Sequence, residues 1–224
     1  MHKKTRKLIK QENLLGFDII GITNNKYTLI EVENNIVDEL VRIHHYSHKP
    51  TKNRFTSFLI NENKGFMQLG YGIRPKIKHL ISSMITMDNY CEFDRMWLSD
   101  DLPKFAESQC ISLLLEFVKI KYPKIKFIIT YADGSVGNTG IIYKATNAIA
   151  IDKLQCDFYL LPNGERIHPV SMYHRHKTRA WQTISKLYPG IKHIKKGYYQ
   201  YRYLYILDKK IRKKFEMEKI SLKS

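Results

Sequence analysis

Residues 90–121, YCEFDRMWLSDDLPKFAESQCISLLLEFVKIK, decide the fold class of this chain. The first part, 90–98, is mostly aromatic and apolar and predicts a strand. Pro103 stands where a helix begins, and residues 104–121 carry a continuous apolar stripe at helical spacing. A strand that leads into a long helix brings free backbone N–H groups and the positive end of the helix dipole to one point. Such a point either holds a pyrophosphate or is an ordinary connection in which Ser108 is solvated.

The other segments predict a mixed α/β sheet rather than the βα repeats of a doubly wound fold. We expect strands over 27–33, 55–60, 66–73, 126–131, 148–160 and 198–207, and helices over 34–46, 140–147, 173–187 and 208–219. The turn-rich segment 61–65 predicts a hairpin. No hydrophilic linker divides the chain, so we expect a single domain. Its core with a basic amino-terminal arm covers 1–170, and a basic part over 171–224 completes the sheet.

Charge is concentrated at the two ends of the sequence. The 224 residues include 38 Lys and Arg and 21 Asp and Glu, which gives a net charge of +17. Residues 1–15 carry +4 and residues 171–224 carry +12, whereas 16–170 carry only +1. A near-neutral body with cationic ends favours a large polyanion such as nucleic acid as the partner. A membrane surface, or no polyanion at all, remains as an alternative.

The sequence lacks the signals of export and membrane insertion. No apolar run approaches the roughly 18 residues of a membrane-spanning helix. No apolar stretch follows the basic first ten residues as it does in a secretory signal. Cys91, Cys110 and Cys156 are scattered, which suits reduced thiols better than a disulfide framework or a metal knuckle. We therefore expect a cytoplasmic protein that has no membrane partner.

A histidine cluster ends the first expected helix. His44 continues the apolar stripe of that helix and suits the core, whereas His45 and His48 either favour the negative helix end or act as a base or metal ligand near neutral pH. A second candidate is Asp133, which follows a buried strand and begins a glycine-rich loop. It is either a catalytic carboxylate or the cap of the next turn. Tyr143 is either a core aromatic or a phenol that points into the same crevice.

The carboxy-terminal part mixes cations with aromatic side chains. Its candidate nucleic-acid contacts are Arg175, Lys177, Arg179, Lys195 and Lys196, with Trp181 close to the first three in sequence. Cations suit phosphate contact and aromatic rings suit base stacking. The His174-x-His176 pair also fits a metal site on a strand, but the local pattern is helical.

Several motifs together resemble the Mom family of bacteriophage DNA-modification proteins. The similar segments are 45–47 (HYS), 93–98 (FDRMWL), 102–108 (LPKFAES), 131–134 (YADG), 137–140 (GNTG) and 142–147 (IYKATN). The segments from 131 onward are the most specific. The resemblance covers roughly residues 35–160.

This resemblance implies a GNAT acetyltransferase-like fold, whose central strands splay to admit acetyl-CoA. It implies conversion of adenine in double-stranded DNA to an N6-carbamoylmethyl base, which protects phage DNA from restriction in the infected bacterium. The implied active-site residues are His45, Tyr46, Asp133 and Tyr143. The implied acetyl-CoA contacts are Trp97, Leu98 and Ser108. Iron is a possible cofactor of the family, for which His45 and Asp133 are the candidate ligands.

One residue departs from the family pattern. Phe105 stands where we expect an asparagine before Ala-Glu-Ser, which affects the expected pyrophosphate loop. Two other functions remain as alternatives. The first is a conventional N-acetyltransferase that acts on protein, tRNA or a small amine, and the second is a DNA-binding protein without enzymatic activity.

Overall fold

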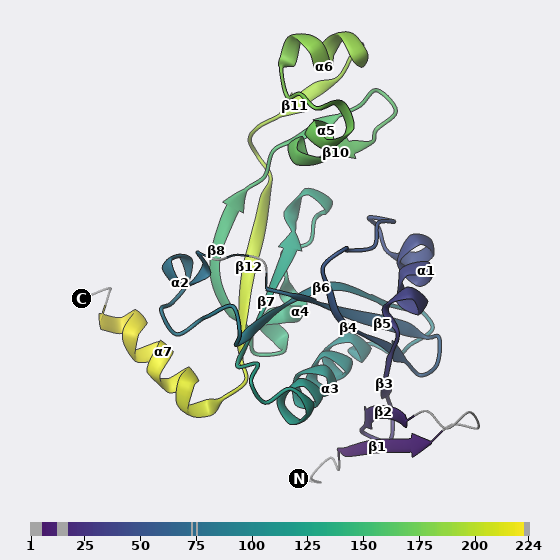
Figure 1. The fold of residues 1–224 in the computed structure, drawn as a ribbon, viewed down its shortest axis with the longest axis vertical. Helices are drawn as coiled ribbons and strands as arrows, with labels where there is room; N and C mark the ends of the chain where they lie inside the picture. Colours follow the sequence, from purple (N-terminus) through teal and green to yellow (C-terminus); the bar gives the residue numbers. More distant parts are fainter. Residues whose placement is uncertain (1–5, 13–17, 73, 75, 222–224) are drawn as a thin grey trace. The chain divides into compact units, whose positions relative to one another are not determined.

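The computed structural model describes residues 6–12, 18–72, 74 and 76–221 (Figure 1). They form two compact units. The first lies within residues 1–131, 141–151 and 203–224, and the second comprises 132–140 and 152–202. The boundary that we predicted at residue 170 falls inside the second unit. We describe each unit by itself.

A nine-stranded mixed sheet has the order β1-β2-β3-β4-β5-β6-β7-β12-β8. Its strands are β1 (Lys7–Glu12), β2 (Asp18–Thr23), β3 (Thr28–Val32), β4 (Arg54–Ile60), β5 (Gly65–Tyr71), β6 (Tyr90–Leu98), β7 (Phe127–Asp133), β8 (Ile149–Gln155) and β12 (Tyr199–Ile206). Neighbours from β1 to β6 pair antiparallel, whereas β6 and β7 pair parallel. The mixed sheet confirms the predicted fold class, and the predicted carboxy-terminal strand is one of its members.

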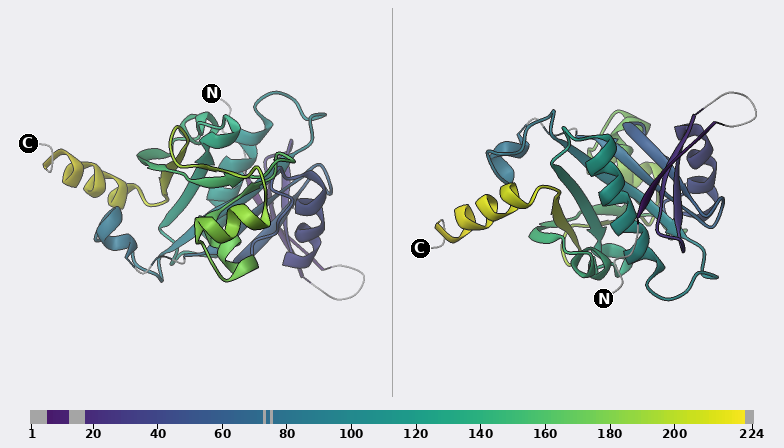
Figure 2. Two further views of the ribbon diagram at one scale, coloured as in Figure 1. Left: turned by 90° about the horizontal axis from the view of Figure 1, so that it is seen from above. Right: turned by 90° about the horizontal axis from the view of Figure 1, so that it is seen from below.

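The helices of the first unit are α1 (Asn34–His44), α2 (Ile77–Leu80), α3 (Ala106–Lys121), α4 (Ile141–Ala145) and α7 (Lys209–Ser221). Phe58 of β4 packs edge to face against Phe117 of α3, with ring centroids 5.1 Å apart. The next residue, Leu59, belongs to the cluster formed by Val37 and Val41 of α1. Because consecutive strand residues point to opposite faces, α1 and α3 cover opposite faces of this part of the sheet (Figure 2).

The second unit contains the 3₁₀ turn η1 (Gly134–Val136), a three-stranded sheet of order β10-β9-β11 and two helices. Its elements are β9 (Phe158–Leu160), β10 (Arg166–Ile167), α5 (Pro169–His176), α6 (Trp181–Leu187) and β11 (Lys192–Ile194). A small core of Tyr159, Leu161, Met172, Ile184 and Ile191 holds them together.

Two predicted elements were wrong in extent. The helix expected over 173–187 is divided into α5 and α6, because Lys177 adopts a left-handed backbone with φ of 57° and its N–H closes the last turn on Tyr173 O at 2.6 Å. A single left-handed residue of this kind is a common helix ending. The strand expected over 148–160 is divided into β8 and β9, which belong to different sheets. The predicted basic arm also contains a strand, β1.

Strands β6 and β7 are paired over only part of their length. Their register runs from Tyr90↔Phe127 to Phe93↔Thr130. Beyond it, β6 continues to Leu98 and β7 to Asp133. Both strands are fully described and form no further pair with each other, so they part after Phe93. We call this point the fork.

Candidate active site at the fork of strands β6 and β7

A β-bulge lies on β6 directly beyond the fork. Gln68 of β5 faces Arg95, and Leu69 faces Phe93, so that Asp94 is an extra residue without an opposite partner on β5. Bulges re-aim a side chain and are common next to active sites. Asp94 and Arg95 were not among the predicted site residues. The available signal was three charged residues, Glu92, Asp94 and Arg95, in a strand whose other residues are aromatic or apolar.

The carboxyl group of Asp94 lies against the backbone of β5. A Cβ on Gly70 would overlap Oδ2 of Asp94 and would lie 2.7 Å from the carbonyl oxygen of Asn53, so only glycine leaves room there. Burial raises the pKa of Asp94 to about 7, and the negative charge of Glu92 adds to this rise, whereas Arg95 opposes it. The carboxyl group is therefore close to half ionised at neutral pH.

Arg95 brings a positive charge to the same place. Its Nη1 donates to the carbonyl oxygen of Asp94 at 2.8 Å. Its Nε is buried and, within the described chain, donates to no protein acceptor. Burial and the neighbouring charges of Arg95 and His48 lower the pKa of His45 to about 4. His45 is therefore neutral at pH 7, and it lies within electrostatic reach of Arg95.

His45 follows the last residue of α1 and is buried. The backbone N–H of Ser47 donates to His45 Nδ1 at 3.1 Å, and the Ser47 hydroxyl lies 2.8 Å from the same nitrogen. Because Nδ1 accepts these bonds, the proton of the neutral ring is on Nε2. In this arrangement Nε2–H is a hydrogen-bond donor, and the nitrogen that would accept a proton is occupied.

Tyr46 and Tyr143 differ in their surroundings. The Tyr46 ring lies 4.3 Å from that of His45 and its side chain is 58% exposed. Tyr143, on α4, is 8% exposed, with its ring 6.3 Å from Phe93 and 5.5 Å from Tyr203. Burial raises the pKa of Tyr143, which opposes a phenolate there. Of the two phenols, Tyr46 is therefore the more accessible.

Asp133 belongs to the second unit. Its Oδ1 accepts the backbone N–H of Ser135 at 2.9 Å, which caps η1. The capping role that we considered for this residue is therefore present. One carboxylate oxygen can cap the turn while the other binds elsewhere, since an ionised carboxylate has about four acceptor positions.

The three expected acetyl-CoA contacts all lie in the first unit. Trp97 and Leu98 are on the part of β6 beyond the fork. The Trp97 indole is stacked on His44 and packs against the α1 cluster. A ligand bound along this part of β6 would therefore contact the main chain of Trp97 rather than its indole ring. Ser108 lies in the first turn of α3, where its hydroxyl donates to Phe105 O at 3.0 Å, and it lines a polar hollow of about 320 Å³ together with Arg6, Ser112 and Asn147.

The residue before α3 has an unusual backbone. Phe105 has a left-handed φ of 68°, and its side chain is 74% exposed. Asparagine is among the few residues that adopt this conformation readily. The asparagine that we expected at this position would thus suit the observed turn, whereas phenylalanine is strained in it.

The predicted nucleic-acid contacts all lie in the second unit and are exposed. Arg179 lies over the Tyr173 ring at 5.5 Å, and Tyr173 and Trp181 are themselves exposed. Arg175 is partly neutralised by Glu165 at 3.4 Å, which leaves Lys177, Arg179, Lys195 and Lys196 as the stronger candidates. In the described part of the second unit, an exposed cation and an exposed aromatic ring are thus in contact at Arg179 and Tyr173.

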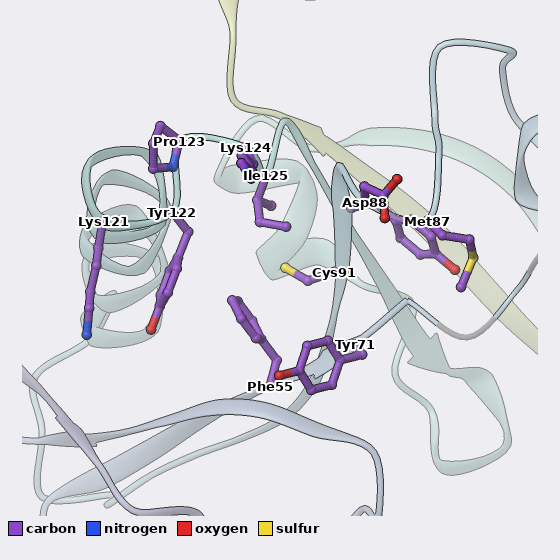
Figure 3. A pocket seen from close by; sticks show the side chains of 11 residues that line it. Phe55, Tyr71, Met87, Asp88, Cys91, Lys121, Tyr122, Pro123, Lys124 and Ile125 are labelled. Atoms are coloured by element: carbon purple, nitrogen blue, oxygen red, sulfur yellow. The ribbon is translucent and has the colours of Figure 1, made fainter.

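A second hollow lies at the opposite end of β6 from the fork (Figure 3). It has a volume of about 460 Å³, and its walls include Phe55, Tyr71 and Tyr122. None of the predicted site residues lines it. Lys121 and Tyr122 are both bound to Glu31, and burial raises the pKa of the Cys91 thiol far above neutrality. This hollow therefore has less reactive chemistry than the fork.

The described residues contain no group of three His, Cys, Asp or Glu side chains that would hold a metal ion. His45 Nδ1 and Asp133 Oδ1 are each engaged by a backbone N–H. The side chains of the described residues do not fit an iron centre. No helix in the described ranges has both the length and the apolar character of a membrane span.

Solved structures with a similar arrangement of strands and helices include several acetyltransferases. The structure resembles Arabidopsis thaliana NAA60 in complex with acetyl-CoA, with a TM-score of 0.47 and 9% identity, over 81% of this chain and 99% of that one. It also resembles an aminoglycoside N(6′)acetyltransferase from Legionella pneumophila, with a TM-score of 0.38 and 10% identity, over 83% and 76% of the two chains. These likenesses concern the fold alone.

The sequence decides the family. Residues 26–222 match the model of the Mom protein family, and the chain belongs to that family. It is 26% identical over 201 residues to the methylcarbamoylase mom of Escherichia phage Mu. The aligned region covers 88% of this chain and 82% of the relative. The resemblance drawn from the motifs is confirmed.

Proposed function

We propose that this protein is a transferase that modifies adenine in double-stranded DNA to an N6-carbamoylmethyl-type base, with acetyl-CoA as the acyl donor, in the cytoplasm of a phage-infected bacterium. The observation that carries the proposal is the family match over residues 26–222, together with the methylcarbamoylase relative. The fork supports the proposal. Beyond Phe93 the edge of β6 is not paired with β7, so an extended acyl donor such as acetyl-CoA could bind along it.

Acetyl-CoA would meet residues from the fork to the start of α3. Backbone groups of Trp97 and Leu98 would bind the extended arm of the carrier, as a strand partner does. The α3 amino terminus and Ser108 would bind its phosphates, because free N–H groups and the helix dipole favour anions. When bound, the donor would supply the two-carbon acyl unit of the modified base.

The adenine would have to leave the DNA stack, which costs a few kcal/mol. The exposed ring of Tyr46 would stack on the extruded base. The Nε2–H group of His45 would donate a hydrogen bond to it, since its Nδ1 is occupied by Ser47. Asp133 of the second unit is the catalytic carboxylate that the family resemblance implies. Lys177, Arg179, Lys195 and Lys196 would contact phosphates, because cations of this kind provide most of the affinity for DNA.

Mass spectrometry of nucleosides tests this function directly. Plasmid DNA from cells that express the protein should contain a modified deoxyadenosine, and DNA from cells that express Asp133→Asn should not, although DNA affinity remains near that of the wild type. Unmodified deoxyadenosine together with an acetylated protein or RNA would instead identify a conventional N-acetyltransferase. Absence of acetyl-CoA binding in calorimetry would identify a DNA-binding protein without enzymatic activity.

A further inference from the structure

An exposed tryptophan begins helix α6 of the second unit. Trp181 is the first residue of this helix, and 46% of its side chain is exposed. The function proposed above gives this ring no role. Aromatic side chains of this size are enriched at binding surfaces, because they bury a large area with few rotatable bonds. The surroundings of the ring indicate which partner suits it.

Two further rings hold the indole of Trp181 in place. Tyr159 of β9 and His193 of β11 face each other across the small sheet, with ring centroids 4.4 Å apart. The indole lies 6.4 Å from the Tyr159 ring and 6.3 Å from the His193 ring, with planes inclined by only 16° and 22°. His193 is itself positioned by Asp157, whose Oδ2 lies 3.0 Å from Nε2. The indole is therefore oriented before a partner binds, and little side-chain entropy is lost on binding.

The charge of the second unit favours a polyanion. Its residues, 132–140 and 152–202, include ten Lys and Arg and four Asp and Glu, which gives a net charge of +6. Lys177 and Arg179 precede Trp181 in the sequence, Lys192 precedes His193, and these three cations are exposed. Such side chains contact phosphates without reading the bases. A partner that offers both phosphates and accessible aromatic faces is a nucleic acid with unpaired bases.

An intact duplex does not offer such faces, because each base is covered by its neighbours in the stack. A base that has left the stack exposes its faces, and stacking on an aromatic ring then stabilises it whatever its identity. The proposed function requires adenine to leave the duplex, which also leaves the opposite nucleotide unpaired. The DNA substrate therefore contains unpaired bases during the reaction.

We propose that Trp181 is a stacking platform for an unpaired base of the DNA substrate, with the neighbouring cations on the adjacent phosphates. The choice of DNA as the partner rests on the proposed function. The platform adds affinity for DNA in which a base has left the stack, whereas an intact duplex gains nothing from it. Trp181 is in this role a binding residue and not a catalytic one.

Tryptophan fluorescence tests the platform directly, because the chain contains only two tryptophans. In Trp97→Phe the remaining indole is that of Trp181, and a base stacked on it should quench its emission. Single-stranded DNA and a duplex with unpaired bases should quench it, but heparin, which offers anions without bases, should not. Trp181→Phe should show no quenching, and the wild type minus Trp181→Phe gives the same comparison by difference. Quenching by heparin as strong as by single-stranded DNA, or none by either, would overturn the platform.

A second measurement compares affinities by fluorescence anisotropy with labelled DNA. Trp181→Leu should weaken the binding of a duplex with unpaired bases by about 5–100-fold, the factor expected for one stacked base, and leave the binding of an intact duplex within about twofold. Leu187→Ala is the matched control, because Leu187 is an exposed apolar residue at the other end of α6, and both affinities should stay unchanged. Equal losses of Trp181→Leu for the two duplexes would overturn the platform. Tighter binding of RNA of the same sequence would overturn DNA as its partner.

The platform and the proposed function fail in different ways. A protein that modifies deoxyadenosine but shows no quenching of Trp181 would retain the function and lose the platform. A protein in which DNA with unpaired bases quenches Trp181, but which leaves deoxyadenosine unmodified, would retain the platform as a DNA-binding surface and lose the function.

Discussion

The imidazole ring of His44 is stacked on the indole of Trp97, with ring centroids 3.8 Å apart and planes inclined by only 13°. His44 is the last residue of α1, and Trp97 lies on β6 beyond the fork. This contact attaches the end of α1 to the strand, and the next residue, His45, begins the loop that reaches Arg95. The stacked pair therefore helps to position the candidate active site without taking part in its chemistry.

Replacement of His44 by alanine should lower the free energy of unfolding by about 1 kcal/mol, because an aromatic pair contributes roughly 0.5–1.5 kcal/mol beyond the area it buries. Urea denaturation measures this change. His79→Ala is the matched control, since His79 is an exposed helical histidine for which no ring contact is described. Equal losses in the two variants would show that the stack contributes nothing.

His45 makes stability depend on pH below neutrality. Its pKa falls from 6.5 to about 4 on folding, so the unfolded chain binds the proton more readily between these values. The stabilising contribution of the neutral ring is complete above pH 6.5 and is lost as the pH falls toward 4, with a total of about 2–3 kcal/mol. In His45→Gln, the difference in unfolding free energy between pH 7 and pH 4.5 should shrink by a similar amount in denaturation curves. An unchanged difference would contradict the buried neutral ring.

Asp94 should act on stability in the opposite direction. Its pKa rises from 3.8 to about 7 on folding, so the folded chain retains a proton that the unfolded chain has released. Stability is therefore lost as the pH rises from about 4 to 7, by up to a few kcal/mol. Asp94→Asn should be more stable than the wild type at pH 8 and indistinguishable from it at pH 3.5 when both are followed by circular dichroism. A less stable variant at pH 8 would argue against a partly buried carboxyl group whose charged form is disfavoured.

Phe105→Asn should stabilise the protein. The left-handed φ of 68° costs a typical side chain about 1 kcal/mol, and asparagine tolerates it. Since the Phe105 ring is mostly exposed, few contacts are lost. Thermal unfolding should show a gain for Phe105→Asn but none for Phe105→Ala, which retains the backbone strain. A gain in both variants would attribute the effect to removal of the exposed ring instead.

The double variant Lys195→Gln/Lys196→Gln should weaken DNA binding. Each lost phosphate contact lowers the slope of log affinity against log salt concentration by about 0.9. Fluorescence anisotropy with a labelled duplex at several salt concentrations measures this slope. Lys64→Gln/Lys119→Gln is the matched control, because these lysines are paired with Asp101 and Glu116. A slope as steep as that of the wild type would remove Lys195 and Lys196 from the DNA contact.

Much of the fold was predictable because its signals are local. The apolar periodicity of residues 104–121 predicted α3, and the turn-rich segment 61–65 predicted the hairpin of β4 and β5. Side-chain spacing depends only on the geometry of the helix or strand that carries it. The family motifs around 131–147 could also be recognised from the sequence, because a motif is defined by the residue types at its positions.

The amino acid sequence by itself thus determined the class of the protein, its family and the cationic character of its ends. Only the tertiary structure showed that β6 and β7 part after Phe93, that a bulge isolates Asp94, and that His45 is neutral with Nδ1 occupied. The reason is that strand register, burial and the charges around a side chain depend on residues far away in the sequence. Gly70 leaves room for Asp94, and Arg95 acts on His45, although each pair is separated by more than twenty residues.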